Sequence, residues 1–85
     1  MGEEVVGKVT DYFSKIGVAA IQVTAGSLSV GDTIRIKGHT TDVTQVVESM
    51  QLEHQAVQRA DTGQTVGTRI KDRVRKGDSV LKVTP

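Results

Sequence analysis

Apolar and polar side chains alternate along most of this chain of 85 residues. In the segment VGKVTDYF, residues 6–13, the alternation places Val9, Asp11 and Phe13 on one side and Tyr12 on the other. Alternation with a period of two is typical of β-strands that bury one face. The same pattern recurs in residues 17–23, 33–37, 65–70 and 79–83. Residues that share a face within these segments include Ala19, Ile21, Val23, Ile34, Ile36, Val66, Thr68 and Ile70.

Two further segments lack a clean alternation. Residues 43–50, VTQVVESM, carry apolar residues on both faces, as expected for a strand that is buried on both sides. Residues 51–61, QLEHQAVQRAD, show only a partial helical spacing, and no capping residue precedes them. We therefore expect an irregular loop around residues 51–55, followed by a short strand or edge.

Six or seven short strands joined by glycine-containing turns, with almost no helix, predict an all-β fold. Nine glycines punctuate the chain, and its single proline is the last residue. A chain of this length supports one domain and not two. We expect residues 1–85 to form a single small closed antiparallel β-barrel, with a core over about residues 5–83.

A Gly-Asp pair precedes two of the expected strands, in SVGDTIRIKG at residues 29–38 and in RKGDSVLKV at residues 75–83. Glycine can take a positive φ, and an aspartate side chain can accept a hydrogen bond from the backbone of its own turn. The repeated pair therefore predicts two similar turns, each of which leads into a strand.

Composition excludes several kinds of site. The chain has no cysteine, so it forms neither disulfides nor thiolate metal sites. No apolar run approaches the roughly 18 residues that are needed to span a bilayer. We expect a cytoplasmic protein that does not contact membranes.

The sequence also lacks the motifs of common enzymes. No serine lies in a GxSxG turn, no HExxH pattern occurs, and the two histidines, His39 and His54, lack partners at the spacing of a metal site or a catalytic dyad. The phosphate-binding motif GxxxxGKS/T and the GTPase motifs DxxG and NKxD are missing. We therefore expect a non-enzymatic protein that has no cofactor, no metal and no nucleotide hydrolysis.

Charge is concentrated late in the chain, although the net charge is only +1. Residues 69–76, RIKDRVRK, hold five of the eleven cations and one carboxylate, Asp72. Cations spaced by two would project from one side of an extended chain about 6–7 Å apart, close to the spacing of successive phosphates. This pattern favours an RNA-facing rail formed by Arg69, Lys71, Arg73, Arg75 and Lys76. The alternative is a charged edge that discourages aggregation between sheets.

A series of short motifs runs through residues 47–81: a Val-x-Ser-Met strand, an Ala-x-x-Gly step, a Val-Gly strand and a basic linker into Gly-Asp-x-Val-Leu. They are formed by Val47, Ser49, Met50, Ala60, Gly63, Val66, Gly67, Lys76, Gly77, Asp78, Val80 and Leu81. With these motifs the chain, from about Val5 to Val83, resembles domain 2 of the translational GTPases, the β-barrel of elongation factor Tu and its counterparts. Similar barrels also occur at the C-terminus of some peptidase-like RNA-modification enzymes.

The resemblance implies a translation-factor-like binding module, because domain 2 of that family helps to hold the acceptor end of aminoacyl-tRNA or faces ribosomal RNA. It also implies family pocket positions at Gln51, His54 and Thr65. We expect the chain to bind tRNA or rRNA, with a translation-related protein as a further candidate partner. The alternative is a protein-interaction module that docks on a larger factor, or on itself through a strand edge. Exposure of Tyr12 together with Val6 would favour that alternative.

Overall fold

The computed structural model describes residues 2–84, which form ten β-strands joined by turns. The strands are β1 (Gly2–Phe13), β2 (Val18–Val23), β3 (Ser27–Ser29), β4 (Thr33–Lys37), β5 (Asp42–Val46), β6 (Met50–Leu52), β7 (Gln55–Val57), β8 (Arg59–Asp61), β9 (Thr65–Arg69) and β10 (Ser79–Thr84). The first and last residues of the expected domain lie outside this description. Residues 2–84 contain no helical segment that could span a membrane. The expected cytoplasmic location stays a prediction.

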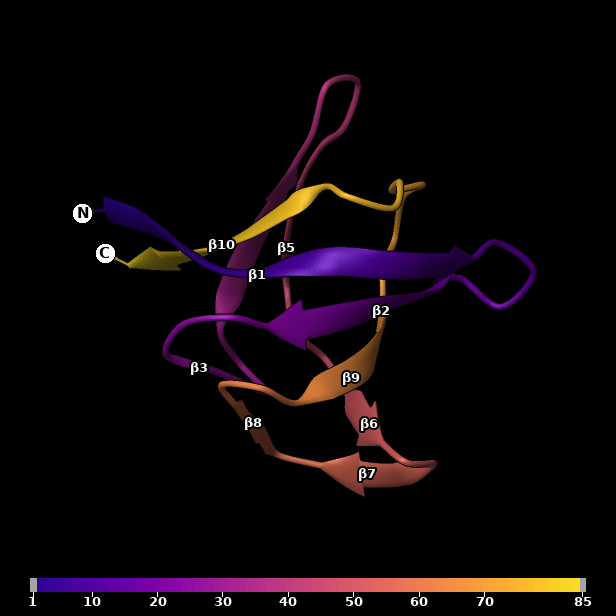
Figure 1. The fold of residues 1–85 in the computed structure, drawn as a ribbon. Helices are drawn as coiled ribbons and strands as arrows, with labels where there is room; N and C mark the ends of the chain where they lie inside the picture. The colour runs from indigo at the N-terminus through magenta and orange to yellow at the C-terminus, as the bar shows by residue number, and fades with distance from the viewer. Residues whose placement is uncertain (1, 85) are drawn as a thin grey trace.

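Backbone pairing arranges eight strands in one antiparallel sheet, in the order β5-β4-β10-β1-β2-β9-β6-β7 (Figure 1). The remaining strands, β3 and β8, pair with each other. The expected all-β antiparallel fold is confirmed. A closed barrel is not found among residues 2–84, because β5 and β7 end the ladder without pairing to each other. The strand count is ten rather than six or seven, since several strands are only three residues long.

The core lies on the inward side of this sheet, and aliphatic side chains fill it. The shared faces that alternation predicts in β2, β4 and β9 are the buried faces. The short β3–β8 pair adds Leu28 and Ala60, which lie opposite each other and are both fully buried. One polar atom is enclosed with them: the Thr68 hydroxyl is buried and has no hydrogen-bond partner among residues 2–84. A core of this kind is small and depends on close packing.

The first strand departs from its expected alternation. The pairing of β1 with β2 shifts register between Val9 and Asp11, as it does at a β-bulge. Beyond the shift, Tyr12 packs against the core and Phe13 points outward, so the predicted grouping of Val9 with Phe13 is wrong. Val6 is also buried. The exposed Tyr12 and Val6 pair that would have favoured a protein-interaction module is therefore not formed.

The two Gly-Asp pairs form turns of the same geometry. Gly31 and Gly77 have φ values of 98° and 95°, in the region that favours glycine. The carboxylates of Asp32 and Asp78 each accept a hydrogen bond of 2.8 Å from the main-chain N–H three residues earlier. Each aspartate N–H donates back to the carbonyl of that same residue at 3.1 Å. The turns lead into β4 and β10, which pair with each other along their length.

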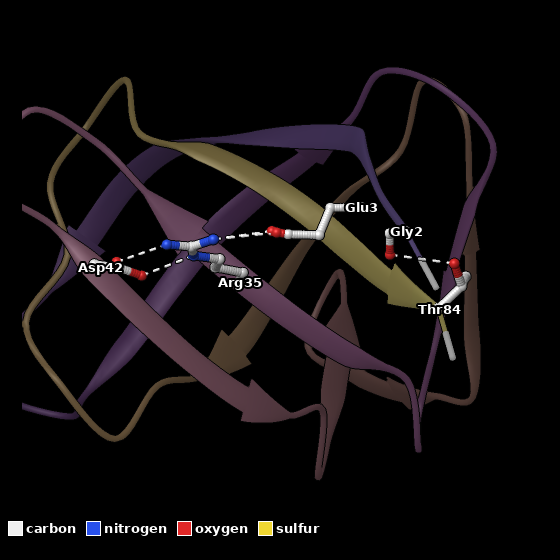
Figure 2. Close-up of polar contacts among 5 residues, drawn as sticks. All are labelled: Gly2, Glu3, Arg35, Asp42 and Thr84. Atoms are coloured by element: carbon white, nitrogen blue, oxygen red, sulfur yellow. Dashed lines mark hydrogen bonds and ion pairs between the residues drawn. The ribbon is translucent and has the colours of Figure 1, made fainter.

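A chain of charged side chains crosses the outward side of β5, β4, β10 and β1 (Figure 2). Arg35 donates to both carboxylate oxygens of Asp42, at 2.9 and 2.8 Å, and to Glu3 at 3.0 Å. The hydrogen bonds from Arg35 hold the pKa of Asp42 below its ordinary value. At the adjacent chain ends, the Thr84 hydroxyl donates to the Gly2 carbonyl oxygen at 3.2 Å.

We expect Gly77→Ala to lower the free energy of unfolding by about 1–2 kcal/mol, because a Cβ disfavours this positive φ. Gly77→Asn is the matched control and should cost less, since asparagine tolerates this region better. Urea unfolding of the three proteins measures the difference. An alanine variant as stable as the parent would show that the turn does not require glycine.

The ion cluster predicts a pH effect on stability. Because the pKa of Asp42 is lower in the folded state, its contribution is present above its unfolded pKa and is lost as the pH falls through the folded pKa. Asp42→Asn should therefore flatten the decline in unfolding free energy on acidification. Asp72→Asn serves as the control, since Asp72 forms no ion pair within residues 2–84. If the unfolding free energy declined equally on acidification in the two variants, the role given to Asp42 would be wrong.

Candidate ligand-binding site

The β6–β7 hairpin turns through two residues in a left-handed backbone conformation. Glu53 has φ 50° and His54 has φ 67°, between the paired residues Leu52 and Gln55. Two successive positive φ values characterise a type I′ turn, which normally contains Asn-Gly or Asp-Gly. Each non-glycine residue in this conformation costs about 1–2 kcal/mol, although histidine tolerates it better than glutamate. The irregular loop that the sequence predicted at residues 51–55 is therefore a strained hairpin.

The outward side of β2 and β9 forms the floor of a hollow beside this hairpin. Alternation turns Val18 and Ala20 outward in β2, and it turns Gly67 outward in β9. Backbone pairing places Ala20 opposite Gly67, and Gly67 opposite Gln51 of β6. Because alanine and glycine have little or no side chain, the surface is low at this point. Side chains from the neighbouring turns rise around it.

The rim of this hollow combines apolar and polar side chains, and the hollow has a volume of about 340 Å³. Phe13 and Ile16, at the β1–β2 turn, are 47% and 61% exposed. Gln51, His54 and Thr65 line the hollow from the β6–β7 hairpin and the start of β9. The structure therefore brings together the three pocket positions inferred from the sequence, although their binding role stays a prediction. We call this site the hairpin hollow.

A second hollow, of about 250 Å³, adjoins the first at Ile16, which lines both. Gln45 of β5 holds its wall in place. The Gln45 amide nitrogen donates to the Arg69 main-chain oxygen, and the amide oxygen accepts from the Lys71 main-chain N–H, each at 2.9 Å. The Gln45 side-chain amide thus makes the pair of hydrogen bonds that a neighbouring strand would make, and it links β5 to the segment that follows β9. We call this site the bridge hollow, and its other lining residues are Gly17, Glu48 and Ile70.

The basic run does not form the extended rail that its spacing suggests. β9 ends at Arg69, and the following segment bends between two buried residues, Ile70 and Val74. Arg69 and Lys71 line the bridge hollow. Neither hollow is lined by Arg73, Arg75 or Lys76. All five cations are exposed, and none forms an ion pair within residues 2–84, where three other cations do.

The chemical groups around the hairpin hollow suit binding. The Gln51 amide, the Thr65 hydroxyl and the His54 imidazole can donate and accept hydrogen bonds, and the Glu53 carboxylate can accept them. Residues 2–84 contain no cluster of three or more histidine, aspartate or glutamate side chains that could hold a metal ion. His39 is exposed in the β4–β5 turn and lines neither hollow.

Curated proteins that are similar to this chain are named as proteases. A collagenase of Porphyromonas gingivalis is 41% identical over 78 residues, which are 91% of this chain and 22% of the collagenase. An uncharacterized protease of Methanocaldococcus jannaschii is 42% identical over 76 residues, which are 88% of this chain and 18% of that protease. The chain therefore spans about a fifth of the length of these relatives. No family model matches the sequence.

Solved structures show which fold the chain shares. A crystal structure described as the "C-terminal domain of Geobacillus thermoleovorans putative U32 peptidase" superposes with a TM-score of 0.88 at 24% identity, covering 95% of this chain and 93% of that domain. Its selenomethionine variant gives a TM-score of 0.84, also at 24% identity, covering 91% of this chain and 96% of that domain. This chain has the fold of that C-terminal domain.

These comparisons correct two expectations. The resemblance to domain 2 of elongation factor Tu is wrong as an assignment, because the relatives are named as collagenase and protease and the matching fold is that of a U32 peptidase C-terminal domain. The translation-related binding of tRNA or rRNA is overturned by the same findings. The motifs that carried the resemblance lie mainly in strands and turns, and two of their residues, Val66 and Gly67, also line the hairpin hollow.

The strained turn yields a prediction about stability. Replacing Glu53-His54 with Asn-Gly should raise the free energy of unfolding by about 1 kcal/mol or more, because both new residues accept positive φ. A matched control is Glu48→Asn combined with His39→Gly, which makes the same two replacements outside this turn. Urea unfolding tests the idea. A double variant at the turn that is no more stable than the parent would show that the turn holds no strain.

Proposed function

We propose that this chain is a non-catalytic accessory domain of a U32 peptidase-like protein, and that its hairpin hollow binds an extended segment of polypeptide. The observation that carries the proposal is the hairpin hollow itself, where exposed Phe13 and Ile16 face a floor of small residues and hydrogen-bonding side chains. The relatives named as collagenase and protease supply the class of ligand, since proteins with these names act on polypeptide chains.

The chemistry of the hollow fits a polypeptide. A peptide offers apolar side chains, which gain free energy when they cover exposed aromatic and aliphatic surface. Its main chain offers N–H and C=O groups in regular order, and the Gln51 amide and the Thr65 hydroxyl can bond to both kinds of group. The volume of about 340 Å³ lies at the small end of the range for ligand pockets, so it would admit one or two side chains rather than a folded partner.

The strain in the β6–β7 turn also supports a binding role. Left-handed backbone conformations in non-glycine residues persist where the surrounding structure enforces them, and they cluster at ligand-binding sites. Glu53 and His54 both line the hairpin hollow, so the strained residues and the proposed ligand site coincide. We place any proteolytic reaction in the other four-fifths of proteins such as these relatives, because this chain matches only about a fifth of their length.

The test is binding of fluorescently labelled, unfolded gelatin fragments to the 85-residue chain, followed by anisotropy. Phe13→Ser combined with Ile16→Ser should weaken binding by about tenfold or more, because each lost apolar contact removes on the order of 1 kcal/mol. Ala20→Leu should also weaken binding, since its larger side chain fills the floor of the hollow. Circular dichroism checks that each variant remains folded.

Val46→Ser is the matched control, because Val46 is 48% exposed and lies outside the hairpin hollow. It should bind the fragments as the parent does. Failure of the parent chain to bind any unfolded polypeptide would refute the proposal. An equal loss of affinity in the control and in the Phe13 and Ile16 variant would refute the location of the site.

A further inference from the structure

The two hollows together form a longer surface, and charged residues line both of them. Ile16 lines both hollows, so a ligand that covers Ile16 can extend into each of them. Glu53 lines the hairpin hollow, and Arg69 and Lys71 line the bridge hollow. An elongated ligand that covers both hollows would meet the apolar side chain of Ile16, a carboxylate in the hairpin hollow and two cations in the bridge hollow.

The backbone that carries Arg69 and Lys71 is held in a fixed position. The buried side chain of Ile70 separates Arg69 from Lys71, and its main-chain N–H donates to the Gly17 carbonyl oxygen at 2.9 Å. The Gln45 amide bonds the main chain of Arg69 and Lys71. These contacts fix the backbone beneath both cations, so a ligand need not order this segment when it binds.

The charge of the bridge hollow is available to a ligand. Arg69 and Lys71 are exposed, and neither forms an ion pair within residues 2–84. Glu48 also lines this hollow and reduces its positive charge. The surrounding residues 69–76 contain five cations and one carboxylate, so the region stays positive when Glu48 is counted. A carboxylate group would therefore be attracted here.

We propose that the polypeptide bound by this chain has an apolar residue with acidic residues on one side of it. The carboxylates of these acidic residues lie at Arg69 and Lys71, and the other end of the polypeptide lies beside Glu53. This inference rests on the proposed function and adds the direction and charge of the ligand. A polypeptide can place an apolar residue over Ile16 and a carboxylate beyond it. A nucleic acid strand instead carries a charge at every step, including beside Glu48 and Glu53, and it is the less suitable ligand.

The test uses three labelled peptides with the same apolar centre and an acidic, a neutral or a basic flank. At low salt the parent chain should bind the acidic peptide at least about tenfold more tightly than the basic one, and added salt should reduce that ratio. Arg69→Gln combined with Lys71→Gln should abolish the preference while it retains binding of the neutral peptide. Retained binding of the neutral peptide also shows that the hairpin hollow is intact.

Arg73→Gln combined with Lys76→Gln is the matched control, because it removes the same charge from residues that line neither hollow. It should keep the preference for the acidic peptide within about twofold. An equal loss of preference in both double variants would overturn the inference, since overall charge would then explain it. Equal binding of the acidic and basic peptides by the parent would also overturn it and would leave the proposed function standing.

Two further outcomes are decisive. If no peptide binds, the proposed function fails and this inference fails with it. If a single-stranded oligonucleotide binds as tightly as the acidic peptide and depends equally on Arg69 and Lys71, the ligand is not a polypeptide and the inference is overturned.

Discussion

The two Gly-Asp turns set where β4 and β10 begin, and the order of the sheet depends on that pair of strands. β10 lies between β4 and β1, so a shift of one residue in its start would turn Val80 from the core to the solvent. The second turn also fixes β1, because Gly77 donates to the Val9 carbonyl at 2.7 Å and Val9 donates to the Asp78 carbonyl at 2.8 Å. The second turn therefore fixes the register of β10 and of its two neighbours, β4 and β1.

The second turn also affects the proposed binding surface, because it holds the residue at which the bulge in β1 begins. The register shift begins at Val9, the residue that the second turn holds on both its N–H and its carbonyl group. Beyond the shift, Tyr12 faces the core and Phe13 faces outward, toward the hairpin hollow. Without the bulge, continued alternation from Val9 would direct Phe13 inward, and the hollow would lose its aromatic rim. The only two aromatic residues of the chain thus have different roles because of one extra residue in the pairing.

Much of the fold follows from the sequence, and the missing parts have physical reasons. Alternation identified the buried faces of β2, β4 and β9, and the Gly-Asp pairs identified the turns before β4 and β10. The bulge was missed, because register depends on the partner strand and leaves no local trace in the alternation. The β6–β7 hairpin was missed because Glu53-His54 lacks the glycine that marks a type I′ turn. The bridge hollow was not predicted, since it depends on Gln45 reaching a segment 24 to 26 residues away.

The resemblance to translation factors predicted a closed barrel and a translation role, and both were wrong because the motifs behind it mostly serve the folding of strands and turns. Val66, Val80 and Asp78 are buried, and Gly77 sits in a turn, so selection on folding alone would preserve such residues in barrels and curled sheets with different roles. The surfaces proposed to bind lie mainly on outward positions and hairpin ends that the core does not constrain, although Val66 and Gly67 also line the hairpin hollow. A shared scaffold can therefore carry different ligands, and the ligand has to be inferred from the hollows and their charges.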